Sequence, residues 1–239
     1  MNIDFSGKVV VVAGGTGGLG RAVSLSFLEA GANVIVTYHN EAEFRALEEV
    51  AGPNRSSLEG HQVDVTDTAA VDGLLTAVLA KHGAVDALVN TVGGYAGGVK
   101  LWDLETKVFD RMLELNLRSG YVLARAVLPT MLKAGRGSIV NVAAKAAIDH
   151  GAGAGAYAAS KAAAVALMDS LAADAKGTGV RVNSILPSII DTPANRQAMP
   201  GADFKTWPKP EDLAHAILFL SSDFAKSIHG AAIPVYGSD

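Results

Sequence analysis

The sequence contains no cysteine among its 239 residues. Disulfide bonds and thiol chemistry are therefore excluded, although this absence leaves the redox compartment open. Aromatic residues are few, at 6% of the chain, and charged residues make up only 18%. Neither sign of charge dominates, because 20 Lys and Arg face 24 Asp and Glu and the basic residues are scattered. The sequence therefore predicts no nucleic-acid partner.

Long apolar runs are missing as well. Every apolar stretch is interrupted by Gly, Asn or a charged residue well short of the ~20 residues that a membrane helix requires. The first twelve residues include Asp4 and lead straight into a strand pattern, which is not typical of a signal peptide. No group of His, Asp and Glu has metal-ligand spacing. We therefore expect a cytoplasmic protein with no membrane partner and no metal.

Apolar residues make up 49% of the chain, and their pattern predicts the fold. Continuous apolar runs of strand length alternate with segments of helical period from one end to the other. Such alternation predicts an α/β fold, a single Rossmann-type doubly wound parallel sheet with helices on both faces. No linker-like composition shift divides the chain, so we expect one domain over residues 1–239. The expected strands are residues 8–13, 33–37, 58–63, 87–90, 138–142, 180–186 and 232–236, and the expected helices are 18–30, 41–50, 67–81, 106–132, 156–176 and 211–220.

A glycine-rich segment, Ala-Gly-Gly-Thr-Gly-Gly-Leu-Gly, follows the first expected strand and opens the first expected helix. Glycines there allow a tight turn, close approach of the backbone to a pyrophosphate, and close packing of helix on strand. The helix N-terminus then attracts phosphate. An ordinary βα turn is the alternative, but the position at the first βα junction favours a nucleotide-binding loop. Its residues are Gly14, Thr16, Gly17, Gly18, Leu19 and Gly20.

Tyr157 and Lys161 lie four positions apart on an expected helix and therefore share a face. A phenol titrates near ~10 and is a poor acid or base at neutral pH. A neighbouring ammonium is expected to lower the pKa of the Tyr157 phenol and to fit the pair for acid–base catalysis. A surface Tyr and Lys on an Ala-rich helix is the structural alternative.

Several motifs in combination resemble those of the short-chain dehydrogenase/reductase (SDR) family over essentially the whole chain. These are the spacing of Gly14, Gly18 and Gly20, the segment from Asn90 to Gly93, Asn116 in Leu-Glu-Leu-Asn-Leu, Tyr157 with Lys161, and the segment from Arg181 to Pro187. The resemblance implies an oxidoreductase in which Tyr157, Lys161 and Asn116 are catalytic. It also implies a homodimer or homotetramer that forms through the helices from Thr106 to Leu132 and from Ala156 to Lys176.

The resemblance implies a nicotinamide dinucleotide cofactor. Family members that prefer NAD(H) place an Asp or Glu after the second strand to bind the ribose diol, whereas this chain has Tyr38 there, followed by His39. We therefore favour NADP(H), with NAD(H) possible. Asp64 matches the residue that meets the adenine, or else it merely precedes a helix. The other cofactor-binding residues implied are Val65, Asn90, Val92, Gly93, Pro187, Ile190 and Thr192, together with Tyr157 and Lys161.

Ala144 stands where most SDR enzymes carry a catalytic Ser, which polarises the substrate carbonyl. The segments around residues 92–98, 143–149 and 186–207 resemble those of dihydropteridine reductases, atypical SDR members that keep Tyr and Lys and lack the Ser. This implies hydride transfer to a conjugated substrate such as quinonoid dihydropterin, because such a ring accepts hydride without building charge on a carbonyl oxygen. Alternatives are a carbonyl reductase of ketone or 3-oxoacyl type and a cofactor-binding protein without turnover. The expected substrate residues are Tyr95, Ala144, Asp149, His150 and Trp207.

The Pro-rich segment after the sixth strand is expected to form a lid over the substrate. Trp207 belongs either to the interior of that lid or to the wall that contacts the substrate ring. Asp149 and His150 would lie at the mouth of the substrate site, with a solvated loop as the alternative.

Overall fold

The computed structural model describes residues 3–237; residues 1–2 and 238–239, which the one-domain prediction includes, lie outside them. Seven parallel strands form one sheet in the order β3-β2-β1-β4-β5-β6-β7. Their bounds are β1 Val9–Ala13, β2 Asn33–Tyr38, β3 Leu58–Gln62, β4 Ala87–Asn90, β5 Gly137–Val142, β6 Val180–Pro187 and β7 Ala232–Val235. The predicted doubly wound parallel sheet is confirmed.

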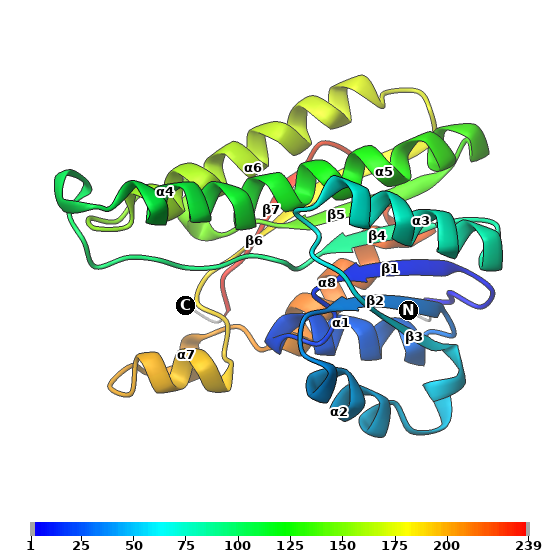
Figure 1. Cartoon of the computed structure of the whole chain (residues 1–239), viewed down its shortest axis with the longest axis horizontal. Helices are drawn as coiled ribbons and strands as arrows, with labels where there is room; N and C mark the ends of the chain where they lie inside the picture. Colours follow the sequence, from blue (N-terminus) through cyan, green and yellow to red (C-terminus); the bar gives the residue numbers. More distant parts are fainter. Residues whose placement is uncertain (1–2, 238–239) are drawn as a thin grey trace.

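Helices cover both faces of this sheet (Figure 1). Their bounds are α1 Gly18–Glu29, α2 Glu41–Ala51, α3 Thr68–His82, α4 Thr106–Leu113, α5 Ser119–Ala134, α6 Gly155–Asp174, α7 Pro193–Ala198 and α8 Pro210–Ser221. Alternate residues of β1 point to opposite faces. Val10 and Val12 pack with α1 and α8, whereas Val9 and Val11 pack with α3, α5 and α6. Each central strand is therefore buried on both sides, which explains why its sequence is a continuous apolar run.

The chain reverses its winding direction between β1 and β4, which are neighbours in the sheet although two strands separate them in sequence. Ala13 pairs with Asn90, and Asn90 pairs in turn with Asn141 on β5. The carboxyl ends of these three strands thus meet at the point where ligands bind in open α/β sheets. The fold therefore directs attention to the segments that follow Ala13, Asn90 and Val142.

Two expected elements differ from the structure. The single helix expected from Thr106 to Leu132 is not regular, because a π-helical turn at Glu114–Arg118 separates α4 from α5. The predicted lid loop contains a short helix, α7, whose N-cap Thr192 accepts a hydrogen bond from the Asn195 N–H. Residues 3–237 contain no helix long and apolar enough to cross a membrane.

Candidate active site

The glycine-rich loop lies between β1 and the N-terminus of α1. Gly14 has φ of +72°, which disfavours other residues. A Cβ on Gly20 would lie 2.0 Å from the Gly14 carbonyl oxygen, so only glycine lets the helix start so close to the strand. No side chain caps α1 at Gly17. The N–H groups of its first turn are therefore available to an anion.

The end of β2 lies beside the glycine-rich loop. The Thr37 hydroxyl accepts a hydrogen bond from Gly14 N–H at 3.0 Å and so fixes the glycine loop. The Tyr38 ring stacks on Phe44 of α2, with ring centroids 4.9 Å apart. His39 is exposed beside them. The Asp64 carboxylate accepts hydrogen bonds from the side chain and the backbone N–H of Thr66, which lower its pKa.

A carboxylate that the sequence reasoning missed lies beside the same loop. The Thr16 hydroxyl of the glycine loop donates a hydrogen bond to Glu43 Oε2 at 3.1 Å. Glu43 is in the first turn of α2. The sequence has Tyr38, not an acidic residue, at the end of the second strand. Glu43 could not be found from the sequence, because no regular spacing links the glycine loop with the next helix.

Asn116 lies in the π-helical turn and is 2% exposed. Its side-chain amide N–H donates to the Gly94 carbonyl at 3.0 Å and to the Ser160 hydroxyl at 2.9 Å, and its oxygen accepts from Gly94 N–H. Asn116 therefore joins the segment after β4 to α6. It is not among the residues that line the cavity at the ends of the strands, and its predicted catalytic role stays a prediction.

Lys161 is buried on α6, and its ammonium donates to the Val142 carbonyl at the end of β5, at 3.0 Å. Burial lowers the pKa of Lys161 to about 8. Gly93 lies close to this ammonium. A Cβ on Gly93 would be 3.0 Å from Nζ of Lys161 and 2.8 Å from Oδ1 of Asn116. Gly93, Asn116 and Lys161 therefore converge, as the family resemblance implies.

Tyr157 lies one turn before Lys161 on α6. Burial, with a smaller contribution from Tyr95, raises the pKa of Tyr157 to about 12. The expected lowering of this pKa is thus wrong for the protein alone, because desolvation of the phenolate dominates. The Tyr95 ring meets the Tyr157 ring edge to face, with centroids 5.0 Å apart. At neutral pH Tyr157 is therefore a protonated phenol that can donate a proton.

These groups face a cavity of about 570 Å³ at the carboxyl ends of the strands. It brings together nine of the predicted residues, namely Leu19, Gly93, Tyr95, Ala144, Asp149, Tyr157, Lys161, Pro187 and Ile190. Sequence reasoning missed Lys145, Ser188 and Asn195 among its other lining residues. These three residues belong to no motif themselves, although they lie near residues that do. Whether their side chains reach the cavity depends on side-chain direction, which the sequence does not show.

Ala144 follows β5 in extended backbone, with φ of −167° and ψ of 159°. The cavity-lining hydroxyls other than those of Tyr95 and Tyr157 are Thr91 and Ser188. Both donate to backbone carbonyls: Thr91 to Ala13 at 2.7 Å, and Ser188 to Tyr236 at 2.7 Å. Within residues 3–237, no serine or threonine hydroxyl of the cavity wall therefore stands in for the absent one at position 144.

Asn90, His150 and Trp207 are among the predicted residues that do not line this cavity. The side-chain amide of Asn90 is buried and donates to Asn141 at 3.0 Å, so it braces β4 against β5. A ring nitrogen of His150 lies 3.3 Å from the Ala147 carbonyl. The Trp207 ring packs against Phe204 with centroids 5.0 Å apart, inside the lid segment. Of the two alternatives for Trp207, the structure favours the lid interior, and a substrate role for His150 or Trp207 stays a prediction.

The lid segment reaches back to the glycine loop. A Cβ on Gly18 would lie 3.0 Å from the Thr192 methyl group. A Cβ on Gly14 would likewise lie 3.0 Å from a methyl group of Val92. Thr192 and Val92 therefore flank the loop, where the resemblance places cofactor contacts. No group of three or more His, Asp or Glu suited to a metal occurs among the described residues.

Known proteins resemble this chain along its whole length. The family model for short chain dehydrogenase matches residues 8–202. D-threitol dehydrogenase from Mycolicibacterium smegmatis is 34% identical, over 99% of this chain and 96% of that protein. A 3-oxoacyl-(acyl-carrier-protein) reductase from Thermotoga maritima is 30% identical, over 97% of both chains. The structure of a short-chain type dehydrogenase/reductase from Mycobacterium ulcerans matches with a TM-score of 0.92 at 26% identity, over 98% of this chain and 90% of that one.

The family model spans most of the chain and includes the glycine loop, Asn116, Tyr157 and Lys161. The geometry of the site agrees with it, because these elements converge at the switch point of the sheet. The chain is an oxidoreductase of the short-chain dehydrogenase/reductase family.

Proposed function

We propose that this protein is an NADP(H)-preferring reductase that transfers hydride to a flat conjugated ring, of which quinonoid dihydropterin is the type substrate. The observation that carries the proposal is the cavity wall at Ala144. Tyr157 and Lys161 line it, while its threonine and serine hydroxyls, those of Thr91 and Ser188, donate to backbone carbonyls.

The residues present fit a nicotinamide dinucleotide. At Gly14 and Gly20 a Cβ would collide with neighbouring atoms, so only glycine keeps the loop in this shape. The start of α1 has no side-chain cap, and its free N–H groups can bind phosphate. We expect Tyr38, His39 and Asp64 to hold the adenosine end, and Lys161, Pro187, Ile190 and Thr192 to hold the nicotinamide end. When bound, the cofactor supplies a hydride, which reduces one double bond of the acceptor together with one proton.

The chain's own residues provide that proton and keep the site in order. Tyr157 holds a proton up to high pH and donates it to the acceptor. Lys161 carries a buried positive charge that stabilises the phenolate left behind. Asn116 keeps Gly94 and α6 together, so that the two walls of the cavity hold their spacing.

The missing hydroxyl bears on the substrate. Reduction of a ketone builds negative charge on its oxygen, and one missing donor to such an oxygen costs a factor of ~10² to 10³ in rate. A conjugated quinonoid ring spreads the incoming electrons over several atoms, so this donor matters less. The small side chains of Ala143, Ala144 and Ala146 leave room for a flat ring beside Tyr95.

Carbonyl reduction is the second candidate. It is favoured by the names of the relatives, D-threitol dehydrogenase and 3-oxoacyl-(acyl-carrier-protein) reductase, which denote alcohol and ketone substrates. In that case Tyr157 would have to serve the carbonyl oxygen without the help of a serine or threonine hydroxyl. A cofactor-binding protein without turnover is the third alternative.

A panel of quinonoid dihydropterin, quinones and ketones with NADPH tests the proposal, with Ala144→Ser as the decisive variant. We expect the native protein to reduce the conjugated acceptors, and Ala144→Ser to raise ketone reduction by at least tenfold, since it restores one donor. Ala143→Ser is the comparison variant: Ala143 also lines the cavity, but adjacent residues in extended backbone point in opposite directions, so its hydroxyl does not reach the position of the family serine. Ketone reduction by the native protein without pterin or quinone reduction would refute the proposal, and cofactor binding without any turnover would favour the third alternative.

The preference for NADP(H) rests on the lack of a carboxylate at Tyr38, yet Glu43 lies near the glycine loop. A carboxylate there repels a 2′-phosphate, and neutralising it is worth about 1 kcal/mol across a partly solvated gap. We therefore expect Glu43→Gln to tighten NADPH binding about threefold to tenfold while NADH binding changes little. Fluorescence titration measures both constants, with the exposed Glu105→Gln as control. Clear preference of the native protein for NADH would refute the NADP(H) assignment.

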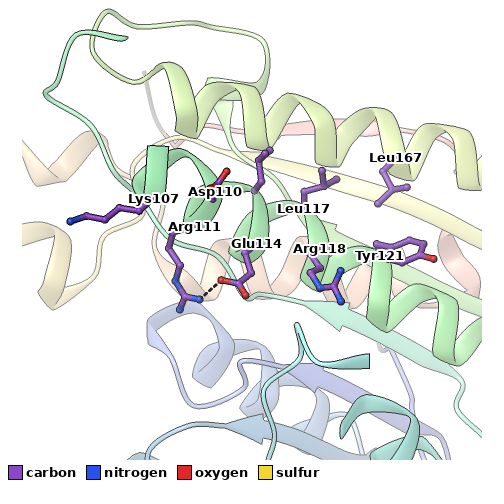
Figure 2. A pocket seen from close by; sticks show the side chains of 9 residues that line it. Lys107, Asp110, Arg111, Glu114, Leu117, Arg118, Tyr121 and Leu167 are labelled. Carbon is purple, nitrogen blue, oxygen red and sulfur yellow. Dashed lines mark hydrogen bonds and ion pairs between the residues drawn. The ribbon is translucent and has the colours of Figure 1, made fainter. Parts of the chain in front are cut away.

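A groove on the α4–α5 and α6 face supports the predicted homo-oligomer. Figure 2 shows its lining, which combines the apolar or aromatic side chains of Leu117, Tyr121 and Leu167 with the charged side chains of Lys107, Asp110, Arg111, Glu114 and Arg118. Its volume is about 780 Å³, and Tyr121 is 49% exposed. Both signs of charge occur in this groove, so a second copy related by a two-fold axis can satisfy it. Light scattering at micromolar concentration should give at least twice the monomer mass of 24.5 kDa, and a monomer would contradict the assignment.

A further inference from the structure

The outer part of the active-site cavity contains an ion pair that the reaction chemistry above does not use. Lys145 and Asp149 both line the cavity that contains Tyr157. Their charged atoms, Nζ and Oδ2, are 3.7 Å apart. Of the cavity-lining residues, only Lys145, Lys161 and Asp149 are Lys, Arg, Asp or Glu, and Lys161 is buried at the reactive end.

Local backbone structure places the two side chains together. A single turn of 3₁₀-helix, Lys145–Ala147, follows directly after Ala144, and Asp149 N–H donates to the Lys145 carbonyl at 2.9 Å. The Lys145 ammonium lies 5.1 Å from the centroid of the Tyr236 ring. The carbonyl of Tyr236 accepts from the Ser188 hydroxyl, which fixes that segment against the cavity wall. Lys145 is thus held in place by a ring contact.

This pair retains most of its hydrogen-bonding capacity. At 3.7 Å the ion pair is too long for a hydrogen bond, and the Lys145 ammonium donates to no other group among residues 3–237. The side chains are 42% and 68% exposed, so the pair adds little to stability. A neighbouring donor and acceptor of opposite charge, open toward a cavity, are available to a ligand.

We propose that Lys145 and Asp149 form a substrate-binding site for a cyclic amide edge, in which a ring N–H donates to Asp149 and the adjacent ring carbonyl accepts from Lys145. This rests on the proposed function and narrows its substrate class. The amino-oxopyrimidine ring of a pterin has such an edge, with N–H donors beside a carbonyl, whereas a simple quinone has only carbonyls. The pair holds the end of the ring that does not react.

The test uses two probes with the protein saturated by NADP⁺ or NADPH. The first is binding of oxidised pterin, a fluorescent molecule, measured by its Kd. The second is a comparison of KM and kcat for quinonoid dihydropterin and for p-benzoquinone. The variants are Lys145→Met and Asp149→Asn. The matched control is Lys8→Met, because Lys8 is 43% exposed and pairs with Asp86 at 3.6 Å, at the opposite end of the sheet.

We expect each cavity variant to weaken pterin binding about tenfold, as loss of a charged hydrogen bond does. KM for quinonoid dihydropterin should rise by a similar factor with kcat within twofold, while KM for p-benzoquinone and all constants of Lys8→Met stay unchanged. Equal effects on both acceptors, or none, would overturn the proposal. Tighter pterin binding by Asp149→Asn would also overturn it, because the site would then select an anion.

The two proposals fail in different ways. If the native protein binds pterin, loses that binding in both variants, and yet reduces no pterin, the amide-edge site stands and the assigned reaction falls. If pterin is reduced and neither variant changes KM, the reaction stands and the amide-edge site is wrong.

Discussion

Replacing Tyr157 by phenylalanine will lower kcat by a factor of about 10² to 10⁴ while cofactor binding stays within about twofold, because the loss is that of one positioned proton donor. The ring remains, so its edge-to-face contact with Tyr95 and the packing of α6 are kept. The measurement is steady-state turnover of quinonoid dihydropterin with NADPH, alongside a cofactor titration.

Tyr95→Phe is the matched control for this variant. Its ring lies against the same phenol, yet its hydroxyl is directed to Gly97, where a Cβ would lie 2.1 Å from it. We expect Tyr95→Phe to retain kcat within about threefold. A Tyr157→Phe protein that keeps native kcat would show that the proton comes from elsewhere, and the assignment of this residue would be wrong.

Replacing Lys161 by methionine should abolish most turnover and at the same time stabilise the fold. Burial lowers the pKa of Lys161 from 10.5 to about 8, which corresponds to about 3 kcal/mol spent on keeping it charged at neutral pH. Methionine fills similar space without charge, and it forfeits the hydrogen bond to Val142, worth about 1 kcal/mol. The net gain at pH 7 is about 2 kcal/mol, a Tm increase of about 4 to 8 °C.

The pH dependence separates this cause from general packing. The native state releases the Lys161 proton near pH 8 and the unfolded chain near 10.5, so the unfolded state binds more protons in between. Native stability therefore rises relative to Lys161→Met as pH rises through this window, and the Tm difference should shrink between pH 7 and pH 10. Native kcat should fall above pH 8 as the ammonium is lost. A Tm difference independent of pH would refute this explanation.

Features that depend on local pattern could be predicted from the sequence. The apolar period gave the strands and their burial, and the glycine spacing gave the loop whose close contacts at Gly14 and Gly20 the structure contains. Tyr157, Lys161 and Asn116 were placed correctly near one another because each belongs to a motif with a fixed position on the fold.

Features that depend on side-chain direction or on competing energies could not be predicted. The contact of Trp207 with Phe204 forms within an irregular segment, where no periodic pattern in the sequence shows the direction of a side chain. The contact of Glu43 with Thr16 joins two elements with no shared period. For Tyr157, the sequence shows the neighbouring Lys161 but not the extent of burial, and burial is the main cause that raises the pKa of this phenol in the folded protein.

The π-helical turn at Glu114–Arg118 makes the number of residues in this part of the helix important for the directions of its side chains. It inserts one residue into the helix, and one residue corresponds to about 100° of rotation in an α-helix. Asn116 points inward to Gly94, whereas Leu117 and Tyr121 face the groove on the outside (Figure 2). A deletion that restored a regular helix would turn one of these sets away from its partners. We therefore expect an insertion or deletion in this turn to disturb both the active site and the outer groove, whereas a substitution at one position acts on one of them.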